Sequence, residues 1–540
     1  MKIIYLSLVL ALSVTVSAQP AIQFVSNKGR KANMTTLNNK IILQGYESTI
    51  GNELFSSDGT SSGTVLLKDL KPGSSGSNPR FFKNALGKVF FRMGTTVFGD
   101  SLFVTDGTSN GTFGLCKYPT LQILNFNSIE MNGKFYFVNS TTASGDELWV
   151  SDGTIAGTQL LKDINPGSGT SNPANFEVLN NKLYFSANDG ANGDELWVTD
   201  GTAGGTVLFK DIYAGATGSQ PQSLKKLNGK IYFGANAGSA AGGKELWETD
   251  GTNAGTVMLK DIIPGNTGSS PNSFYEFNSK LYFSAEGPSV ARELYVTDGT
   301  AVGTTLVADI SPGTNSSLPF GFCSSGSNLF FSATNINTCG YELFSYSPVT
   351  NSVTLMMDAI PGTTHGFNNA VLDETIAHVG SYGVAVAKEN NNLTDLWLSD
   401  GTSGGTSKIK YAVNTYTTAE QIYFQLLNNE LYFYGSYGSG DFGLFKLSNL
   451  PLGIAQIQKQ AIQFSIYPNP ANELITVKFE RPDNEDTKIT LSNVLGQVLL
   501  SESIYANDTV LRTDNLKTGV YFITIENKGA QSTQKIIIEH

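Results

Sequence analysis

One stretch of the sequence, Glu195-Leu-Trp-Val-Thr-Asp-Gly-Thr-Ala-Gly-Gly-Thr-Val-Leu-Phe-Lys-Asp-Ile212, recurs in close copies along most of the chain. In it, two runs of β-forming residues flank the turn sequence Asp200–Gly205. Asp-Gly favours a turn because glycine accepts a positive φ and aspartate hydrogen-bonds to its own backbone. The stretch therefore predicts a β-hairpin, with the facing pairs Thr199/Thr206, Trp197/Leu208 and the oppositely charged Glu195/Lys210.

Each hairpin follows another β-rich motif, such as Asn181–Ala187, and a shorter apolar piece, such as Phe176–Leu179. One unit is therefore four short strands, and its turn aspartate recurs about every 48 residues. These aspartates are Asp58, Asp106, Asp152, Asp200, Asp250, Asp298 and Asp400. A degenerate unit is hidden at Tyr341–Gly362, and a truncated unit follows at Glu430–Leu447.

A four-stranded unit of this length has the size of a propeller blade, whose inner strands are apolar on both faces because neighbouring blades cover them. The predicted fold is all-β, with a large β-propeller of eight or nine four-stranded blades over residues 19–447. The last unit lacks its fourth strand, so we expect Ala21–Val25 to complete that blade and close the ring. An open superhelical array is the alternative.

The units resemble the ELWxxDGT repeat of secreted Bacteroidetes proteins over roughly residues 30–450. Three copies match the pattern residue for residue: Glu147–Thr154, Glu195–Thr202 and Glu245–Thr252. The resemblance implies a surface or secreted protein, but the repeat itself does not define a molecular role.

The N-terminus has the pattern of a secretory signal peptide at residues 1–18. One lysine precedes an apolar run from Ile3 to Val16, and Val16-Ser-Ala18 is a small-residue cleavage site that would leave Gln19 first. The competing interpretation is a retained anchor, although the run is too short to span a membrane. No later stretch predicts a membrane span.

A different composition begins after Leu447, where residues 448–463 are expected to form a linker. Short alternating strands in 464–540 predict a small immunoglobulin-like β-sandwich. This segment resembles the type A sorting domain of the type IX secretion system. The matching motifs are Tyr467–Pro470, Asn493–Gly496, Leu516–Tyr521 and Lys535–Ile538.

The resemblance implies that type IX machinery recognises this domain and exports the chain through the periplasm and outer membrane. The protein would then be secreted or attached to the outer cell surface. The residues that carry the implied secretion signal are Pro468, Asn469, Pro470, Gly496, Gly519, Tyr521 and Lys535. An ordinary adhesive sandwich is the alternative.

A formal net charge of −11 with no clustered Lys or Arg argues against nucleic acid as a partner. The three histidines form no zinc or triad pattern. Cys323 and Cys339 flank one predicted strand and are a candidate disulfide in an oxidising compartment. The four tryptophans share one repeat position, which indicates packing between blades rather than sugar-binding platforms.

Each Asp-Gly-Thr aspartate is expected to form an Asx turn, because one carboxylate supplies too few oxygens for calcium. The best metal candidate is the stretch 188–195, where Asp189, Asn192, Asp194 and a carbonyl would bind calcium. No other cofactor is predicted.

The sequence favours a non-enzymatic binding or adhesion scaffold, whose propeller loops present a surface to a glycan or an extracellular protein. The alternative is a carbohydrate-active or other hydrolase with its site at the propeller channel. Its candidate residues lie in 363–395 and are His365, Asp373, Glu374 and His378. A third hypothesis is a purely structural layer component.

Overall fold

The structure is a computed structural model. It describes residues 21–29, 34–95, 99–118, 127–238, 242–358, 376–379, 382–388, 394–409, 424–428, 430–437, 441–448, 464–479, 487–493, 498–504, 508–527 and 530–539. The predicted signal peptide and residues 449–463 of the predicted linker lie outside these ranges. The chain divides into two compact units, Met1–Pro451 and Leu452–His540.

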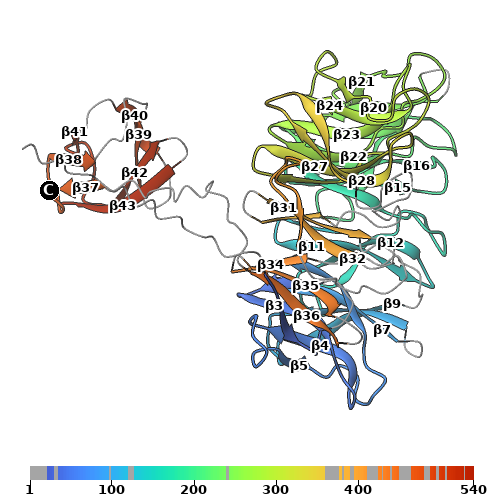
Figure 1. Ribbon diagram of the computed structural model, residues 1–540, viewed down its shortest axis with the longest axis horizontal. Coiled ribbons are helices and arrows are strands. Elements are labelled where there is room, and N and C mark those ends of the chain that lie inside the picture. The colour runs from blue at the N-terminus through green and yellow to red at the C-terminus, as the bar shows by residue number, and fades with distance from the viewer. Residues whose placement is uncertain are drawn as a thin grey trace, which may run out of the picture. The chain divides into compact units, whose positions relative to one another are not determined.

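The described part of the N-terminal unit forms nine four-stranded antiparallel sheets, which we call blades 1 to 9 (Figure 1). Blade 1 contains β2 (Thr35–Leu37), β3 (Lys40–Glu47), β4 (Gly51–Ser57) and β5 (Val65–Lys68). Blade 2 contains β6 (Pro79–Ala85), β7 (Lys88–Thr95), β8 (Gly99–Thr105) and β9 (Phe113–Tyr118). Blade 3 contains β10 (Ser128–Met131), β11 (Lys134–Thr141), β12 (Gly145–Ser151) and β13 (Gln159–Lys162).

The next three blades are the most regular copies of the repeat. Blade 4 contains β14 (Ala174–Leu179), β15 (Lys182–Asn188), β16 (Asp194–Thr199) and β17 (Val207–Lys210). Blade 5 contains β18 (Gln222–Leu227), β19 (Lys230–Asn236), β20 (Lys244–Thr249) and β21 (Val257–Lys260). Blade 6 contains β22 (Asn272–Phe277), β23 (Lys280–Glu286), β24 (Arg292–Thr297) and β25 (Thr305–Ala308).

The last three blades depart most from the repeat. Blade 7, the degenerate unit, contains β26 (Phe320–Ser325), β27 (Asn328–Asn335), β28 (Cys339–Ser347) and β29 (Ser352–Met357). Blade 8 contains β30 (Ile376–Val379), β31 (Tyr382–Lys388), β32 (Thr394–Ser399) and β33 (Ser407–Lys408). Blade 9 contains β34 (Phe424–Leu427), β35 (Glu430–Tyr437), β36 (Asp441–Ser448) and the N-terminal β1 (Ala21–Ser26).

Blade 9 confirms the prediction that the N-terminal segment supplies the missing strand. β1 pairs antiparallel with β36, with Ala21 opposite Ser448 and Phe24 opposite Phe445. The first strands of neighbouring blades contact one another, as β14 does with β18 and β18 with β22, so these strands lie innermost. β1 is therefore the outermost strand of its blade.

The hydrophobic core of this unit is a series of layers between consecutive blades. Each layer combines buried or partly buried residues of two neighbouring blades, from blades 1 and 2 through to blades 8 and 9. One more layer joins Leu444 and Val25 of blade 9 to Leu43 and Phe55 of blade 1. In Figure 1 the blue β3 and β4 accordingly lie beside the orange β35 and β36. The ring is therefore closed, as the propeller prediction requires.

The tryptophan position belongs to these layers. Trp197 of blade 4 is buried against Leu161 and Ile164 of blade 3, and Trp247 of blade 5 packs against Leu196 of blade 4. This position packs one blade against the preceding one, which confirms the structural role predicted for the indoles.

The C-terminal unit is a two-sheet sandwich, as predicted. One sheet consists of β37 (Phe464–Tyr467), β38 (Leu474–Phe479) and β41 (Asp508–Arg512). The other consists of β40 (Val498–Ile504), β39 (Thr487–Asn493), β42 (Gly519–Asn527) and β43 (Ala530–Ile538). Alternate residues of both sheets, including Ile475, Val477, Ile489 and Ile523, form its core. Across the described residues, no helix is long and apolar enough to cross a membrane.

Candidate functional site

The glutamate that begins the repeat motif is buried beneath the linker to the next blade. Glu195 is 0% exposed, and its carboxylate accepts hydrogen bonds from the backbone N–H groups of Ile212 (2.9 Å), Tyr213 (3.0 Å) and Ser219 (2.7 Å). The Ser219 hydroxyl donates a further bond of 2.6 Å. Residues 212–219 join blade 4 to blade 5, so this one carboxylate fixes the path of the chain between two blades.

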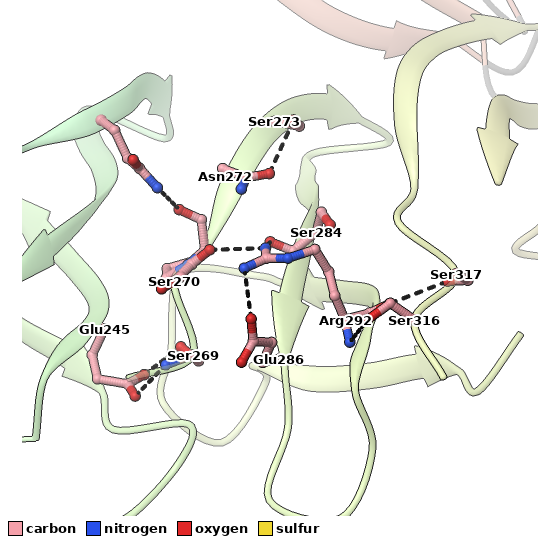
Figure 2. Close-up of polar contacts among 12 residues, drawn as sticks. Glu245, Ser269, Ser270, Asn272, Ser273, Ser284, Glu286, Arg292, Ser316 and Ser317 are labelled. Carbon is pink, nitrogen blue, oxygen red and sulfur yellow. Dashed lines mark hydrogen bonds and ion pairs between the residues drawn. The ribbon is translucent and has the colours of Figure 1, made fainter. Parts of the chain in front are cut away.

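The bond from the serine hydroxyl to the glutamate, which we call the Glu–Ser latch, is found in five blades within the described residues, with a constant separation of 24 residues. Its pairs are Glu53/Ser77, Glu147/Ser171, Glu195/Ser219, Glu245/Ser269 and Glu293/Ser317. Figure 2 shows one copy, in which both the backbone and the side chain of Ser269 bond to Glu245. Sequence reasoning missed these serines, although each begins a Ser-X-Pro motif at a fixed distance from the glutamate.

The middle residue of each Ser-X-Pro motif adopts a left-handed backbone conformation, which turns the chain into the next blade. The φ values are 50° at Asn78, 48° at Asn172, 50° at Gln220, 48° at Ser270 and 47° at Leu318. Asn tolerates this region better than most residues, whereas a bulky apolar residue is uncommon there. The repeated conformation explains why this position is polar in most copies.

Burial dominates the electrostatics of the latch. It raises the pKa of Glu147 to about 7, despite hydrogen bonds from Ser171, Ile164 and Asn165 that favour the ionised form. Burial also raises the pKa of the other four latch glutamates, which are Glu53, Glu195, Glu245 and Glu293. These carboxyl groups are therefore harder to ionise than an exposed glutamate.

The predicted ion pair between Glu195 and Lys210 is wrong. A β-bulge between Leu196 and Trp197 shifts the register, so Lys210 lies opposite Leu196, while Trp197 still faces Leu208 as predicted. The Lys210 ammonium reaches blade 5 instead, where it donates to the carbonyl of Asn253 at 3.2 Å. Lys68 and Lys260 donate in the same way to loop carbonyls of the following blade. The lysine is thus a contact between blades.

The Asp-Gly-Thr turn is held by its own side chains, which confirms the predicted Asx turn. Asp200 Oδ1 accepts from the N–H of Thr202 at 2.9 Å and from its hydroxyl at 2.7 Å. Both bonds lower the pKa of Asp200, the hydroxyl having the larger effect. The Thr202 Oγ1 in turn accepts from the N–H of Gly205 at 2.9 Å. A Cβ on Gly205 would lie 2.1 Å from Asp200 Oδ1, so any side chain there would displace the Asp200 carboxylate from its hydrogen bonds.

Two of the three candidate calcium ligands contact each other. Asp189 Oδ1 accepts from the N–H groups of Ala191 and Asn192, and Oδ2 accepts from the Asn192 side-chain amide at 2.7 Å. Burial opposes ionisation of Asp189, but these hydrogen bonds outweigh it and hold its pKa below the usual value. Asp194 lies opposite Asn188 at the end of the β15–β16 ladder. Calcium binding by this loop stays a prediction.

The candidate disulfide is not formed: within the described residues, Cys323 and Cys339 are not bonded to each other. Cys323 packs with Phe330 and Leu343 in the layer toward blade 8, whereas Cys339 packs with Phe331 in the layer toward blade 6. The two thiols therefore point to opposite faces of blade 7. Burial raises the pKa of Cys323 to about 11, so this thiol stays protonated.

The region proposed for a hydrolase site is only partly described. His365, Asp373 and Glu374 lie outside the described residues, and the backbone of His378 pairs with Gly383 between β30 and β31. Among the described residues, no group of three or more His, Cys, Asp or Glu side chains is arranged to hold a metal ion.

In the C-terminal unit, the side chain of Asn469 binds the backbone of the last strand. Its Nδ2 donates to the Lys535 carbonyl at 3.1 Å, and its Oδ1 accepts from the N–H of Ile537 at 2.9 Å. Ala471 continues this contact by pairing with Ile538. Residues 469–471 thus cover the outer edge of β43 over 535–539, with the exposed Pro468 and Pro470 on either side of Asn469.

Two of the remaining implied signal residues, Gly519 and Tyr521, lie on β42, which pairs with β43. Gly519 opens β42 opposite Ile538, and Tyr521 is buried with its hydroxyl donating to the Lys517 carbonyl at 2.9 Å. A tyrosine that bonds a few residues upstream fixes the corner before a strand, as in other sandwiches. Gly496 lies outside the described residues.

Comparison with known families matches residues 465–539 to the secretion system C-terminal sorting domain. The C-terminal unit is therefore a sorting domain, which supports export by the type IX secretion system to the cell surface or the medium. No curated protein sequence matches the chain significantly.

Several solved structures are similar in fold. PorZ, an essential surface component of the type IX secretion system of Porphyromonas gingivalis, is 11% identical, with a TM-score of 0.31 over 94% of this chain and 75% of PorZ. A puromycin hydrolase is 12% identical, with a TM-score of 0.35 over 68% of this chain and 58% of its own. A puromycin-hydrolysing peptidase of Mycobacterium tuberculosis is 12% identical, with a TM-score of 0.38 over 66% and 57%. This chain spans little more than half the length of the two hydrolases.

Proposed function

We propose that the chain is an exported protein whose propeller of nine blades binds a glycan or an extracellular protein without catalysing a reaction. The type IX machinery recognises the C-terminal sorting domain, and the propeller is the cargo that works on the cell surface or outside the cell. In this proposal the repeat motif is a framework, and binding depends on the loops that differ between blades.

The observation that carries the proposal is the use of the motif side chains within the fold. The latch glutamates are 0% exposed and each accepts a serine hydroxyl, so they are out of reach of a substrate. The turn aspartates hydrogen-bond to their own loops, as Asp200 does with Thr202. The two acidic groups of the repeat motif, its glutamate and its turn aspartate, therefore serve the architecture.

The loops between the second and third strands of each blade vary in sequence, which supports a binding role for the face of the ring that they form. In antiparallel blades, the loops between second and third strands lie at the end opposite to the Asp-Gly-Thr turns. These loops differ in length and sequence, as 142–144, 189–193 and 287–291 show, whereas the turns are nearly identical. Varied loops on a rigid framework are the usual basis of selective recognition.

Binding is tested by applying the full mature chain to an array of glycans and extracellular matrix proteins, with and without calcium. We expect specific retention of at least one ligand, and roughly tenfold weaker binding when residues 189–193 are replaced by glycine and serine. The matched control replaces the turn residues 203–204, which lie on the other face. The D189A variant tests the calcium prediction. If binding of the ligand depends on calcium in the native protein but not in D189A, then Asp189 is a calcium ligand. Turnover of a glycan or peptide without stable retention would contradict the proposal.

Export is tested separately by deleting residues 465–539 and locating the propeller in cell fractions. We expect the truncated chain to remain inside the outer membrane, and a reporter placed between residues 1–18 and residues 452–540 to reach the surface. Export of the truncated chain at the normal level would contradict the role of the sorting domain.

A further inference from the structure

The N-terminal residues 21–29, which we call the clasp, touch both sides of the point where the ring closes. Their first part, β1, extends blade 9 through its ladder with β36. Their second part reaches blade 1, where Gly29 bridges to Gly45 and the Lys28 carbonyl accepts from the N–H of Tyr46 at 2.7 Å. The clasp therefore joins the last blade to the first.

Most of the clasp is held by its backbone, with a few side chains anchored. Val25 is 4% exposed and lies in the layer that contains Leu444 and Phe55, between blades 9 and 1. Phe24 is 53% exposed and rests edge-on against Phe445, with ring centroids 5.3 Å apart. The Lys28 ammonium lies 2.5 Å from the Glu47 carboxylate of blade 1. Backbone pairing with a buried side chain as anchor is how sheets recruit an extended peptide.

The receiving side is shaped for this segment. A Cβ on Gly443 of β36 would lie 2.1 Å from the Ser26 carbonyl, and one on Gly29 would lie 2.8 Å from the Leu444 nitrogen. The register also shifts between Phe24 and Ser26, which directs Val25 inward. Glycines on both partners thus permit a close backbone approach that any side chain would prevent.

We propose that the seam between blades 9 and 1 is a binding site for an extended peptide, which the chain fills with its own residues 21–29 and which accepts the same segment from a second copy. The β1 part of the clasp is the outermost strand of its blade, so its departure breaks no pairing among the three strands inside it. Exchange of such a terminal element between identical chains is a known route to dimers. This site is independent of any glycan or protein ligand of the loops.

The test uses the full mature chain with residues 30–33 replaced by the recognition sequence of a specific protease, so that the ring folds before it is cut. After cleavage, we expect the clasp to stay bound through size-exclusion chromatography. A fluorescent peptide of residues 21–29 in excess should then replace it at a ratio of one peptide per chain. A V25D peptide should bind at least tenfold more weakly, because it buries a carboxylate in an apolar layer.

Two controls make the result decisive. The uncut chain should take up little peptide, since its own clasp competes at a high effective concentration. The G443V variant, cut in the same way, should release its clasp and fail to bind the peptide. The proposal is overturned if the cut clasp shows no exchange up to the unfolding transition, or if the V25D peptide binds as well as the native one.

Discussion

The hydroxyl of Tyr432 in blade 9 lies against Gly59 in the turn of blade 1, only 2.2 Å from where a Cβ on that glycine would sit. The same contact joins Tyr136 to Gly201, Tyr184 to Gly251 and Tyr232 to Gly299. In those pairs the tyrosine precedes the glycine by one blade, whereas Tyr432 and Gly59 come from opposite ends of the propeller sequence. The repeat thus uses one contact both to stack blades and to close the ring.

Substitution of Gly59 by alanine tests the importance of the seam. Gly59 has a φ of +92°, which alanine adopts only with strain, and the new methyl group would also collide with Tyr432. We expect the G59A variant to lose about 2–4 kcal/mol of unfolding free energy, measured by urea denaturation. The matched control is G73A, because Gly73 has a φ of +104° but no atom near its Cβ position. Equal losses in the two variants would show that the seam contact contributes nothing.

Removal of a latch carboxylate should be costly because several donors lose their acceptor together. In the E195A variant, the N–H groups of Ile212, Tyr213 and Ser219 have lost their carboxylate acceptor. We expect a loss of about 3–5 kcal/mol, against about 1 kcal/mol for S219A, which removes one hydroxyl donor. Thermal unfolding of both variants provides the measurement. A loss for E195A no larger than that for S219A would argue against the latch.

The pH dependence of stability follows from the same glutamates. Because their folded pKa values are raised, they contribute stability that is fully present below about pH 4.5 and declines as pH rises through the folded value, about 7 for Glu147. The folded state holds more protons than the unfolded state in this window, so the unfolding free energy should fall with rising pH. The turn aspartates have lowered pKa values, so their contribution to the unfolding free energy is lost only below this pH window.

Urea denaturation between pH 4.5 and 7.5 measures this slope, and the E147Q variant provides the comparison. Glutamine does not titrate, so the slope of E147Q should be shallower than that of the native protein. An identical slope in both proteins, or stability that rises with pH between 4.5 and 7.5, would refute the raised pKa assigned to Glu147.

The sequence predicted the blades because the repeat records both their period and their strand pattern. The turn residues Asp200, Thr202 and Gly205 interact within six positions, so their bonds can be inferred from local chemistry. The closing strand was predictable for a different reason. The last unit contained one strand too few, and only Ala21–Val25 was left to supply it.

The errors arose where the backbone departs from a regular ladder. The bulge after Leu196 removes Lys210 from Glu195, and nothing in the alternation of residues marks its position. The spacing of Cys323 and Cys339 likewise gave no information about which face of blade 7 each thiol occupies. The partner of Glu195 was missed because Ser219 lies 24 residues away, beyond the hairpin that suggested a pairing.

The hydrogen bonds between the Asn469 side chain and the backbone of the last strand lead to a prediction for export. The N469A variant loses both bonds to the backbone of β43, at Lys535 and Ile537. We expect the sorting domain to lose about 1–3 kcal/mol of unfolding free energy, because the edge of β43 is no longer covered on this side. The amount of protein at the cell surface should fall in parallel. The control is R512A, since Arg512 is 77% exposed and its ion pair with Asp514 is worth little. If N469A is less stable than R512A but reaches the cell surface at the same level, then the secretion machinery recognises the domain even when the edge of β43 is uncovered.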